Sequence, residues 1–142
     1  MPKDNEPSPL AAVHDWVSAF NDGNFKRIAS LYADDAALWG TLASSLITSP
    51  PEIASYFESA LQGTPSPTVS LTEVHLQSFE SMAIASGSYL LCLTSAGEPV
   101  SLPARFTFTF KPVAGAWLIV NHHSSLVPIA THAAPAPNPR GA

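Results

Sequence analysis

The residues best suited to chemistry stand near the end of the chain, in the run Trp-Leu-Ile-Val-Asn-His-His-Ser-Ser. His122 and His123 each carry an imidazole that can serve near neutral pH as general base, general acid or hydrogen-bond donor. Because adjacent strand residues point to opposite faces of a sheet, only one of them can enter a given pocket. If His122 faces the pocket, Ser124 does too; if His123 does, Ser125 does. The alternative is a histidine hydrogen-bonded within the sheet or a subunit interface.

Arg105 is the lone charged residue inside a predicted strand, in the run Arg-Phe-Thr-Phe-Thr-Phe. A buried guanidinium needs a partner, because an unpaired buried charge is costly. The neighbouring predicted strands offer no carboxylate, so the partner is either a helix carboxylate such as Asp15 or a bound anion. Arg105 is therefore a candidate clamp for a carboxylate ligand, which a guanidinium can hold with two hydrogen bonds. A structural ion pair, or a position at the exposed rim of the sheet, is the alternative.

Large aromatic residues lie on the surfaces that are expected to meet in the core. Most of them fill the core, and some line a cavity if the sheet curves away from the helices, with tyrosine hydroxyls as polar groups. The candidate ligand-binding aromatics are Trp16, Tyr32, Trp39, Tyr56 and Tyr89. By contrast, Asp34 and Asp35 are interpreted as solvated residues at a helix end, and Cys92 as a small buried hydrophobe.

Composition excludes several other chemistries. A single cysteine rules out a disulfide framework and every multi-cysteine zinc site. Phosphate-binding glycine loops, HExxH, GxSxG and two-histidine-one-carboxylate spacings are missing, so no metal and no cofactor is expected. A net charge of −5 argues against binding nucleic acid or an anionic membrane. Because the sequence shows no signal peptide and no long apolar run, we expect a soluble, cytoplasmic protein.

These candidates must be positioned by one folded unit, since 142 residues suit a single domain. Prolines cluster at both ends of the chain. We therefore predict an N-terminal tail over residues 1–9, one domain over residues 10–128 and a flexible Pro/Ala-rich tail over residues 129–142.

Helical signals come first in the predicted domain. Apolar residues three and four positions apart predict an amphipathic helix over residues 10–20. Asn24 can cap a second helix over residues 25–32. Ser49, followed by two prolines and Glu52, predicts the start of a third helix with a capping box.

After Pro67 the apolar period changes from 3.6 to 2. A slip in the alternation between Leu71 and Val74 indicates a β-bulge. Strands are predicted at residues 69–76, 83–93, 101–110 and 117–125, and a short hairpin at residues 37–39 and 46–47. The order α-α-β-β-α-β-β-β-β predicts an α+β fold with helices packed on one face of an antiparallel sheet.

The predicted sheet carries few charges. Between Ser81 and Val120 the charged residues are Glu98, Arg105 and Lys111. If the outer face of the sheet were solvated, polar and charged residues would alternate with apolar ones along each strand. Because so few residues are charged, this face is expected to be covered. The sequence therefore predicts a homodimer through the sheet face.

Several segments resemble a known superfamily. Ala-Phe-Asn-Asp-Gly-Asn followed by Ile-Ala-Ser-Leu-Tyr-Ala-Asp-Asp-Ala resembles the opening of nuclear transport factor 2-like (cystatin-like, SnoaL-like) domains. The segment from Arg105 to Ser125 is similar to the bacterial branch related to the calcium/calmodulin-dependent protein kinase II association (hub) domain and the SgcJ/EcaC proteins. The resemblance implies a cone, in which a curved sheet wraps around a long helix with a pocket inside and a dimer across the sheet.

The same resemblance implies two kinds of function. In the hub branch, strand arginines line the pocket and hold carboxylates, and only Arg105 maps to such a position here. Catalytic relatives include ketosteroid isomerases, polyketide cyclases and dehydratases, whose acid/base set Tyr32, Tyr56 and a terminal histidine could imitate. One hypothesis is thus a small-molecule-binding protein or an acid/base enzyme of secondary metabolism. Its ligand would be a small carboxylate or an aromatic compound. The alternative is a non-catalytic homodimerisation module.

Overall fold

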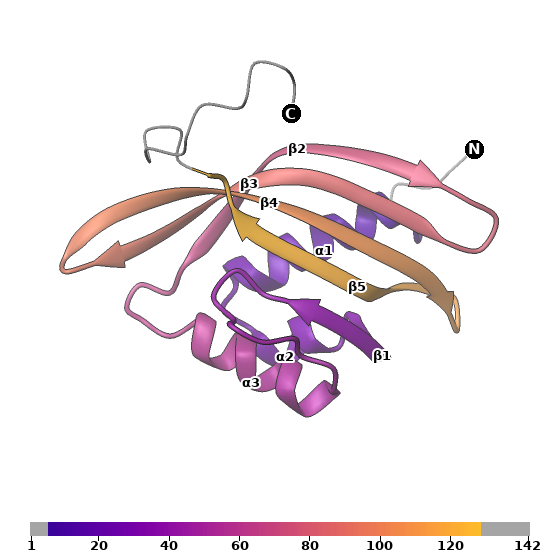
Figure 1. Ribbon diagram of the computed structural model, residues 1–142, viewed down its shortest axis with the longest axis horizontal. Helices are drawn as coiled ribbons and strands as arrows, with labels where there is room; N and C mark the ends of the chain where they lie inside the picture. The colour runs from indigo at the N-terminus through magenta and orange to yellow at the C-terminus, as the bar shows by residue number, and fades with distance from the viewer. Residues whose placement is uncertain (1–5, 129–142) are drawn as a thin grey trace, which may run out of the picture.

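The computed structural model describes residues 6–128, and the predictions made for residues 1–5 and 129–142 lie outside this range. The helices of the described range are α1 (Pro9–Asn21), α2 (Phe25–Ala29) and α3 (Pro50–Ala60). The strands are β1 (Tyr32–Trp39), β2 (Thr68–Ser78), β3 (Ala83–Ser95), β4 (Glu98–Val113) and β5 (Ala116–Leu126). The strands form one curved sheet, and α1 lies along one of its faces with α2 and α3 beside β1 (Figure 1). The predicted α+β class is confirmed.

Side-chain caps begin all three of these helices. Ser8, Asn24 and Ser49 each accept a hydrogen bond from the backbone N–H three residues further on. Ser49 also donates to Glu52 Oε1 at 2.8 Å, so the predicted pairing of these two residues is confirmed. None of the helices in residues 6–128 is long and apolar enough to cross a membrane.

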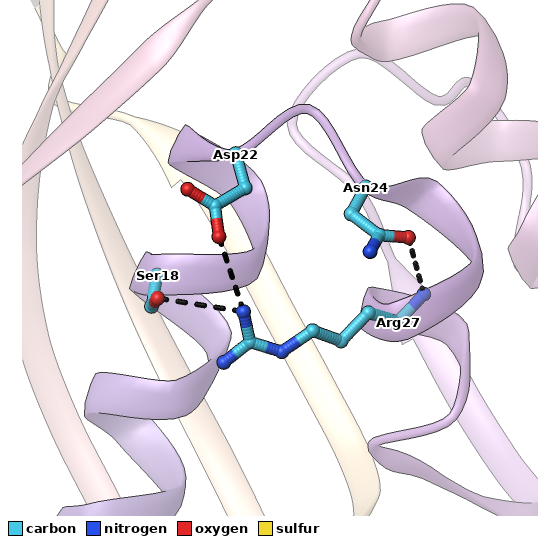
Figure 2. A network of polar contacts seen from close by, with 4 residues as sticks. All are labelled: Ser18, Asp22, Asn24 and Arg27. Atoms are coloured by element: carbon cyan, nitrogen blue, oxygen red, sulfur yellow. Dashed lines mark hydrogen bonds and ion pairs between the residues drawn. The ribbon is translucent and has the colours of Figure 1, made fainter.

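A small polar network fixes the corner between α1 and α2 (Figure 2). The Arg27 guanidinium donates to Asp22 Oδ2 at 3.2 Å and to Ser18 Oγ at 3.5 Å. Gly23, between the two helices, has φ +67°, a conformation that glycine adopts without strain. Because the ion pair is exposed, it contributes at most about 1 kcal/mol, and the turn is held mainly by the burial of the flanking helices.

The sheet has the strand order β1-β5-β4-β3-β2. Its four last strands pair antiparallel, and the register shift between Leu71 and Glu73 confirms the predicted bulge in β2. Ala114 and Gly115 both have positive φ and join β4 to β5 in a two-residue hairpin turn. The sequence predicts an antiparallel sheet throughout, whereas β1 joins the edge of β5 in parallel.

The core lies between the sheet and the helices. Phe106, Phe108 and Phe110 on β4 are at most 5% exposed, whereas Arg105 and Thr107, which alternate with them, are exposed on the outer face. The phenylalanines of β4 therefore face the core, and Arg105 and Thr107 face the outer side of the sheet. From the helices the core receives Val13, Trp16, Ala19, Phe20, Ile28, Ile53 and Phe57.

The segment after α2 differs from its prediction. Tyr32 is predicted in the second helix, but α2 ends at Ala29 and Tyr32 opens β1. Asp34 and Asp35 are exposed residues within this strand rather than at a helix end, and Asp35 accepts from Lys111 Nζ on β4 at 3.2 Å. The tyrosine stands on the helical period of the preceding residues, but backbone pairing with β5 keeps its segment extended.

The predicted short hairpin is also reduced. Instead of two strands, a single antiparallel bridge joins Leu38 of β1 to Ile47. The predicted third helix is α3, which ends at Ala60 with Leu61 as its cap residue.

Candidate functional site

A cavity of about 50 Å³ lies between α1, α3 and the inner face of the sheet. Its wall is mainly aromatic and aliphatic, and none of the lining residues carries a charge. One of the lining residues, Leu42, is 62% exposed. The polar lining side chains are Thr41, Tyr56, Tyr89, His122 and Ser124.

His122 stands at the end of a buried hydrogen-bond chain. The Trp16 indole donates from Nε1 to the Tyr32 hydroxyl oxygen at 3.0 Å, and that hydroxyl lies 2.7 Å from His122 Nδ1. The imidazole also packs on the Phe108 ring, with 4.3 Å between the centroids. His122 is 2% exposed, and its Nε2 is buried without a hydrogen-bond partner.

Burial decides the protonation of these groups. Desolvation, with a smaller contribution from the neighbouring His123, lowers the pKa of His122 from 6.5 to about 3. The imidazole is therefore neutral at physiological pH. Desolvation likewise raises the pKa of the Tyr32 and Tyr56 hydroxyls, so both stay protonated. The cavity thus offers neutral hydrogen-bonding groups and holds no ionised base.

Three hydroxyl groups form a second polar cluster in the cavity wall. Ser124 Oγ lies 2.6 Å from both the Tyr89 hydroxyl and Thr41 Oγ1, and the last two are 3.3 Å apart. Ser124 lies on β5 and Tyr89 on β3, the two strands that flank β4, and Thr41 comes from the loop after β1. The cluster therefore closes the wall where this loop meets the sheet.

Tyr56 on α3 forms part of the same wall near the cavity mouth. Its hydroxyl oxygen accepts from the backbone N–H of Leu42 at 3.1 Å. The Tyr56 ring lies directly against the Gly40 backbone, where a Cβ atom would collide with it. Glycine at this position thus lets the loop after β1 approach α3.

The predicted site residues divide between the two faces of the sheet. His122 and Ser124 face the cavity together, as the paired-facing argument requires, with Trp16, Tyr32, Tyr56 and Tyr89 around them. The other three candidates, Arg105, Trp39 and His123, lie on the outer side of the sheet.

Arg105 therefore does not meet the cavity residues. Its Nε donates to Ser125 Oγ at 3.2 Å, and it lines a broad hollow on the outer face. The expected partnership with Asp15 is absent, since that residue lies on α1 across the sheet. Trp39 is 41% exposed and packs beside the His123 ring, with 6.5 Å between centroids.

Sequence reasoning missed Thr41 and Gly40. Neither belongs to a periodic run, because both lie in the irregular loop that follows β1. A pocket residue on such a loop leaves no spacing signal, and only its three-dimensional partners identify it. In the described part of the chain, no three His, Cys, Asp or Glu side chains gather as metal ligands would.

The curved sheet, the helices along one face and the cavity between them define the cystatin-like, NTF2-like class of fold. The chain belongs to the SnoaL-like domain family, whose match spans residues 10–130. No curated protein matches the chain in sequence.

Three solved structures illustrate what the chain is similar to. A proposed calcium/calmodulin-dependent protein kinase II association domain from Xanthomonas campestris is 31% identical, with a TM-score of 0.76 over 90% of this chain and 99% of that one. The kinase hub homology domain from Chlamydomonas reinhardtii is 24% identical, with a TM-score of 0.69 over 84% of this chain and 95% of that one. A proposed NTF2-like dehydratase from Streptomyces avermitilis is 15% identical, with a TM-score of 0.72 over 84% and 94%. The last two show the shared fold.

Proposed function

We propose that the protein binds a small organic molecule in the cavity between α1, α3 and the sheet. The observation that carries this proposal is His122, which lines the cavity and holds a buried Nε2 without a partner. Leaving a buried polar atom unpaired costs about 1–3 kcal/mol. A ligand atom that forms a hydrogen bond with Nε2 recovers this free energy, so the cavity favours a ligand with a polar group next to His122.

Chemistry of the cyclase, isomerase or dehydratase kind, if it takes place in this cavity, would use neutral groups. An imidazole with a pKa of about 3 is a weak base at neutral pH, so His122 would hydrogen-bond a reacting oxygen rather than remove a proton. Tyr32 and Tyr56 would act as protonated hydroxyls. The similarity to the proposed dehydratase from Streptomyces avermitilis supports a ligand-handling role at the level of the fold.

A thermal-shift screen tests the binding proposal, with small carbonyl compounds, carboxylates, aromatic polyketide-like compounds and steroids as ligands. A compound present at ten times its Kd should raise the melting temperature by about 3–5 °C, because it binds the native state alone. The shift should disappear in His122→Phe, which removes the ring nitrogens and keeps an aromatic ring. It should persist in His123→Phe, the same change at the neighbouring exposed position.

Two results would contradict ligand binding at His122. One is a screen in which no compound stabilises the protein. The other is a stabilisation of equal size in the wild type and in His122→Phe, which would place the bound compound elsewhere.

A second candidate function is homo-association through the outer face of the sheet. The hollow on this face is lined mainly by small uncharged side chains, with Arg105 and Glu73 as opposite charges. A twofold interface brings each surface against its own copy, so such a pair of charges can be matched across it. The 31% identity to the proposed association domain from Xanthomonas campestris supports this candidate.

The substitution Thr107→Glu tests the association face, because Thr107 is exposed at the centre of the outer hollow. A glutamate is larger than threonine and must give up its hydration in a packed interface, so the variant should run as a monomer in light scattering. Ser59→Glu, which adds the same charge on exposed α3, should leave the oligomer unchanged. A Thr107→Glu protein with wild-type mass would exclude this face as the interface.

A further inference from the structure

The hydrogen atoms around Tyr32 determine which nitrogen of His122 carries the ring proton. The Trp16 indole can only donate, so the Tyr32 oxygen accepts at that contact. The remaining contact of the hydroxyl within the described residues is His122 Nδ1, at 2.7 Å. The single hydroxyl proton of Tyr32 therefore goes to Nδ1, which accepts it.

The opposite arrangement is unfavourable. If Nδ1 carried the proton and donated to Tyr32, the tyrosine oxygen would accept twice and its own proton would lack an acceptor. Tyr32 is only 6% exposed, so water cannot replace the missing partner. A neutral imidazole with Nδ1 as acceptor carries its proton on Nε2. The unpartnered atom in the cavity wall is consequently an N–H donor.

The other polar groups of the wall point to the same kind of ligand. Thr41, Tyr89 and Ser124 have three mutual contacts for three hydroxyl protons, so a closed ring among them uses every proton. Tyr56 accepts from the Leu42 N–H and keeps its own proton free to donate. The protons of the wall that lack an acceptor among the described residues are therefore those on His122 Nε2 and the Tyr56 hydroxyl, and a ligand can supply that acceptor.

The charge of the cavity narrows the ligand class further. No lining residue is charged, and Arg105, the cation expected to clamp a carboxylate, lies on the opposite face of the sheet. An ionised carboxylate entering this wall would lose its hydration without gaining a counter-charge. An uncharged acceptor avoids that cost and still satisfies the donors.

We propose that the cavity selects uncharged carbonyl compounds, whose oxygen accepts a hydrogen bond from His122 Nε2–H, and that Tyr32 and Trp16 are positioning residues that hold the proton on Nε2. This inference rests on the proposed ligand-binding function and names its substrate class. The same donor stabilises an oxyanion or enolate that develops on the carbonyl oxygen, which is electrophilic assistance by a neutral imidazole.

Nitrogen-15 NMR of the histidine rings in the full chain tests the positioning step without any ligand. The His122 ring should show a protonated Nε2 and an unprotonated Nδ1 at pH 7. Tyr32→Phe removes the donor to Nδ1, so the two tautomers should become mixed. Tyr56→Phe removes a hydroxyl from the same cavity that has no bond to His122, and it should leave the tautomer unchanged. Backbone spectra of both variants confirm that they are folded.

Three probes of four heavy atoms each test the ligand class: acetone, 2-propanol and acetate. Acetone offers only an acceptor, 2-propanol also brings a donor, and acetate brings a charge. Titration at pH 7, followed by the His122 ring resonances, should give acetone at least about a tenfold lower Kd than acetate. The exposed His123 ring serves as the reference for general solvent effects.

The outcomes separate this inference from the function on which it rests. A protonated Nδ1 on His122, or acetate binding as tightly as acetone, overturns the inference while ligand binding itself stands. A protonated Nε2 with no perturbation of the cavity by any probe overturns the ligand-binding proposal, and this inference with it. A protonated Nε2 with preferential binding of acetone supports both.

Discussion

Lowering the pH from 6.5 to 4 is expected to reduce the free energy of unfolding by about 3 kcal/mol through His122 alone. Its pKa is about 3 in the folded protein and 6.5 in the unfolded chain. Between these values the unfolded chain binds more protons than the folded one. The contribution of the neutral buried ring is therefore fully present above pH 6.5, and it is lost as the pH falls toward 3.

Urea denaturation at pH 4 to 7 measures this loss. The His122→Phe variant should lack about 3 kcal/mol of the wild-type dependence, because phenylalanine takes no proton. His123→Phe should keep most of the wild-type pH dependence, because it leaves in place the burial of His122, which is the main cause of its lowered pKa. If the free energy of unfolding depended on pH equally in the wild type and in His122→Phe, His122 would be solvated or charged in the folded protein. That result would also remove the basis for a neutral donor in the cavity.

Phe108→Ala is expected to destabilise the protein by about 3–5 kcal/mol, the range found when a buried phenylalanine is truncated. Phe108 is 2% exposed, and the rings of both His122 and Trp16 pack against it. Its centroid lies 4.3 Å from that of His122 and 5.6 Å from that of Trp16. Removing it leaves a void that the sheet cannot fill, and the imidazole loses the surface that fixes its plane.

The matched control for this change is Phe79→Ala, at a position that is 57% exposed between β2 and β3. The same atoms are deleted there from an exposed side chain, so the expected loss in the free energy of unfolding is below about 1 kcal/mol. Urea midpoints with unchanged slopes give both values. A loss of similar size at both positions would mean that Phe108 is not part of the packed core.

Much of the fold could be predicted because its signals are local. The Ser49–Glu52 pairing, the Asn24 cap and the bulge after Leu71 each depend on residues a few positions apart. Their structural outcome follows from local hydrogen bonding and side-chain alternation. The inward row of β4 was equally readable, since alternate residues of a strand must face the same way.

The failures concern contacts between distant residues. Tyr32 continues the helical spacing of α2, and only the pairing with β5, whose Ile119 lies opposite, makes it extended. The apolar neighbours of Arg105 in the sequence are compatible both with a buried charge that clamps a ligand and with an exposed arginine on the sheet, and only the facing of β4 decides for the exposed position. The facing of His122 was left open because alternation alone leaves two choices, and the bond to Tyr32 decides between them.

The parallel pairing of β1 with β5 has a consequence for how the chain acquires its structure. Tyr32 can pair with Ile119 only after the whole sequence between them has been synthesised. The hydrogen bond between Tyr32 and His122 joins residues 90 positions apart. Contacts of such long separation close late and slow folding. During synthesis, β1 cannot pair with β5 until β5 has been made. The cavity wall therefore cannot be complete before β5 has paired with β1, and the bond from Tyr32 to His122 requires both strands.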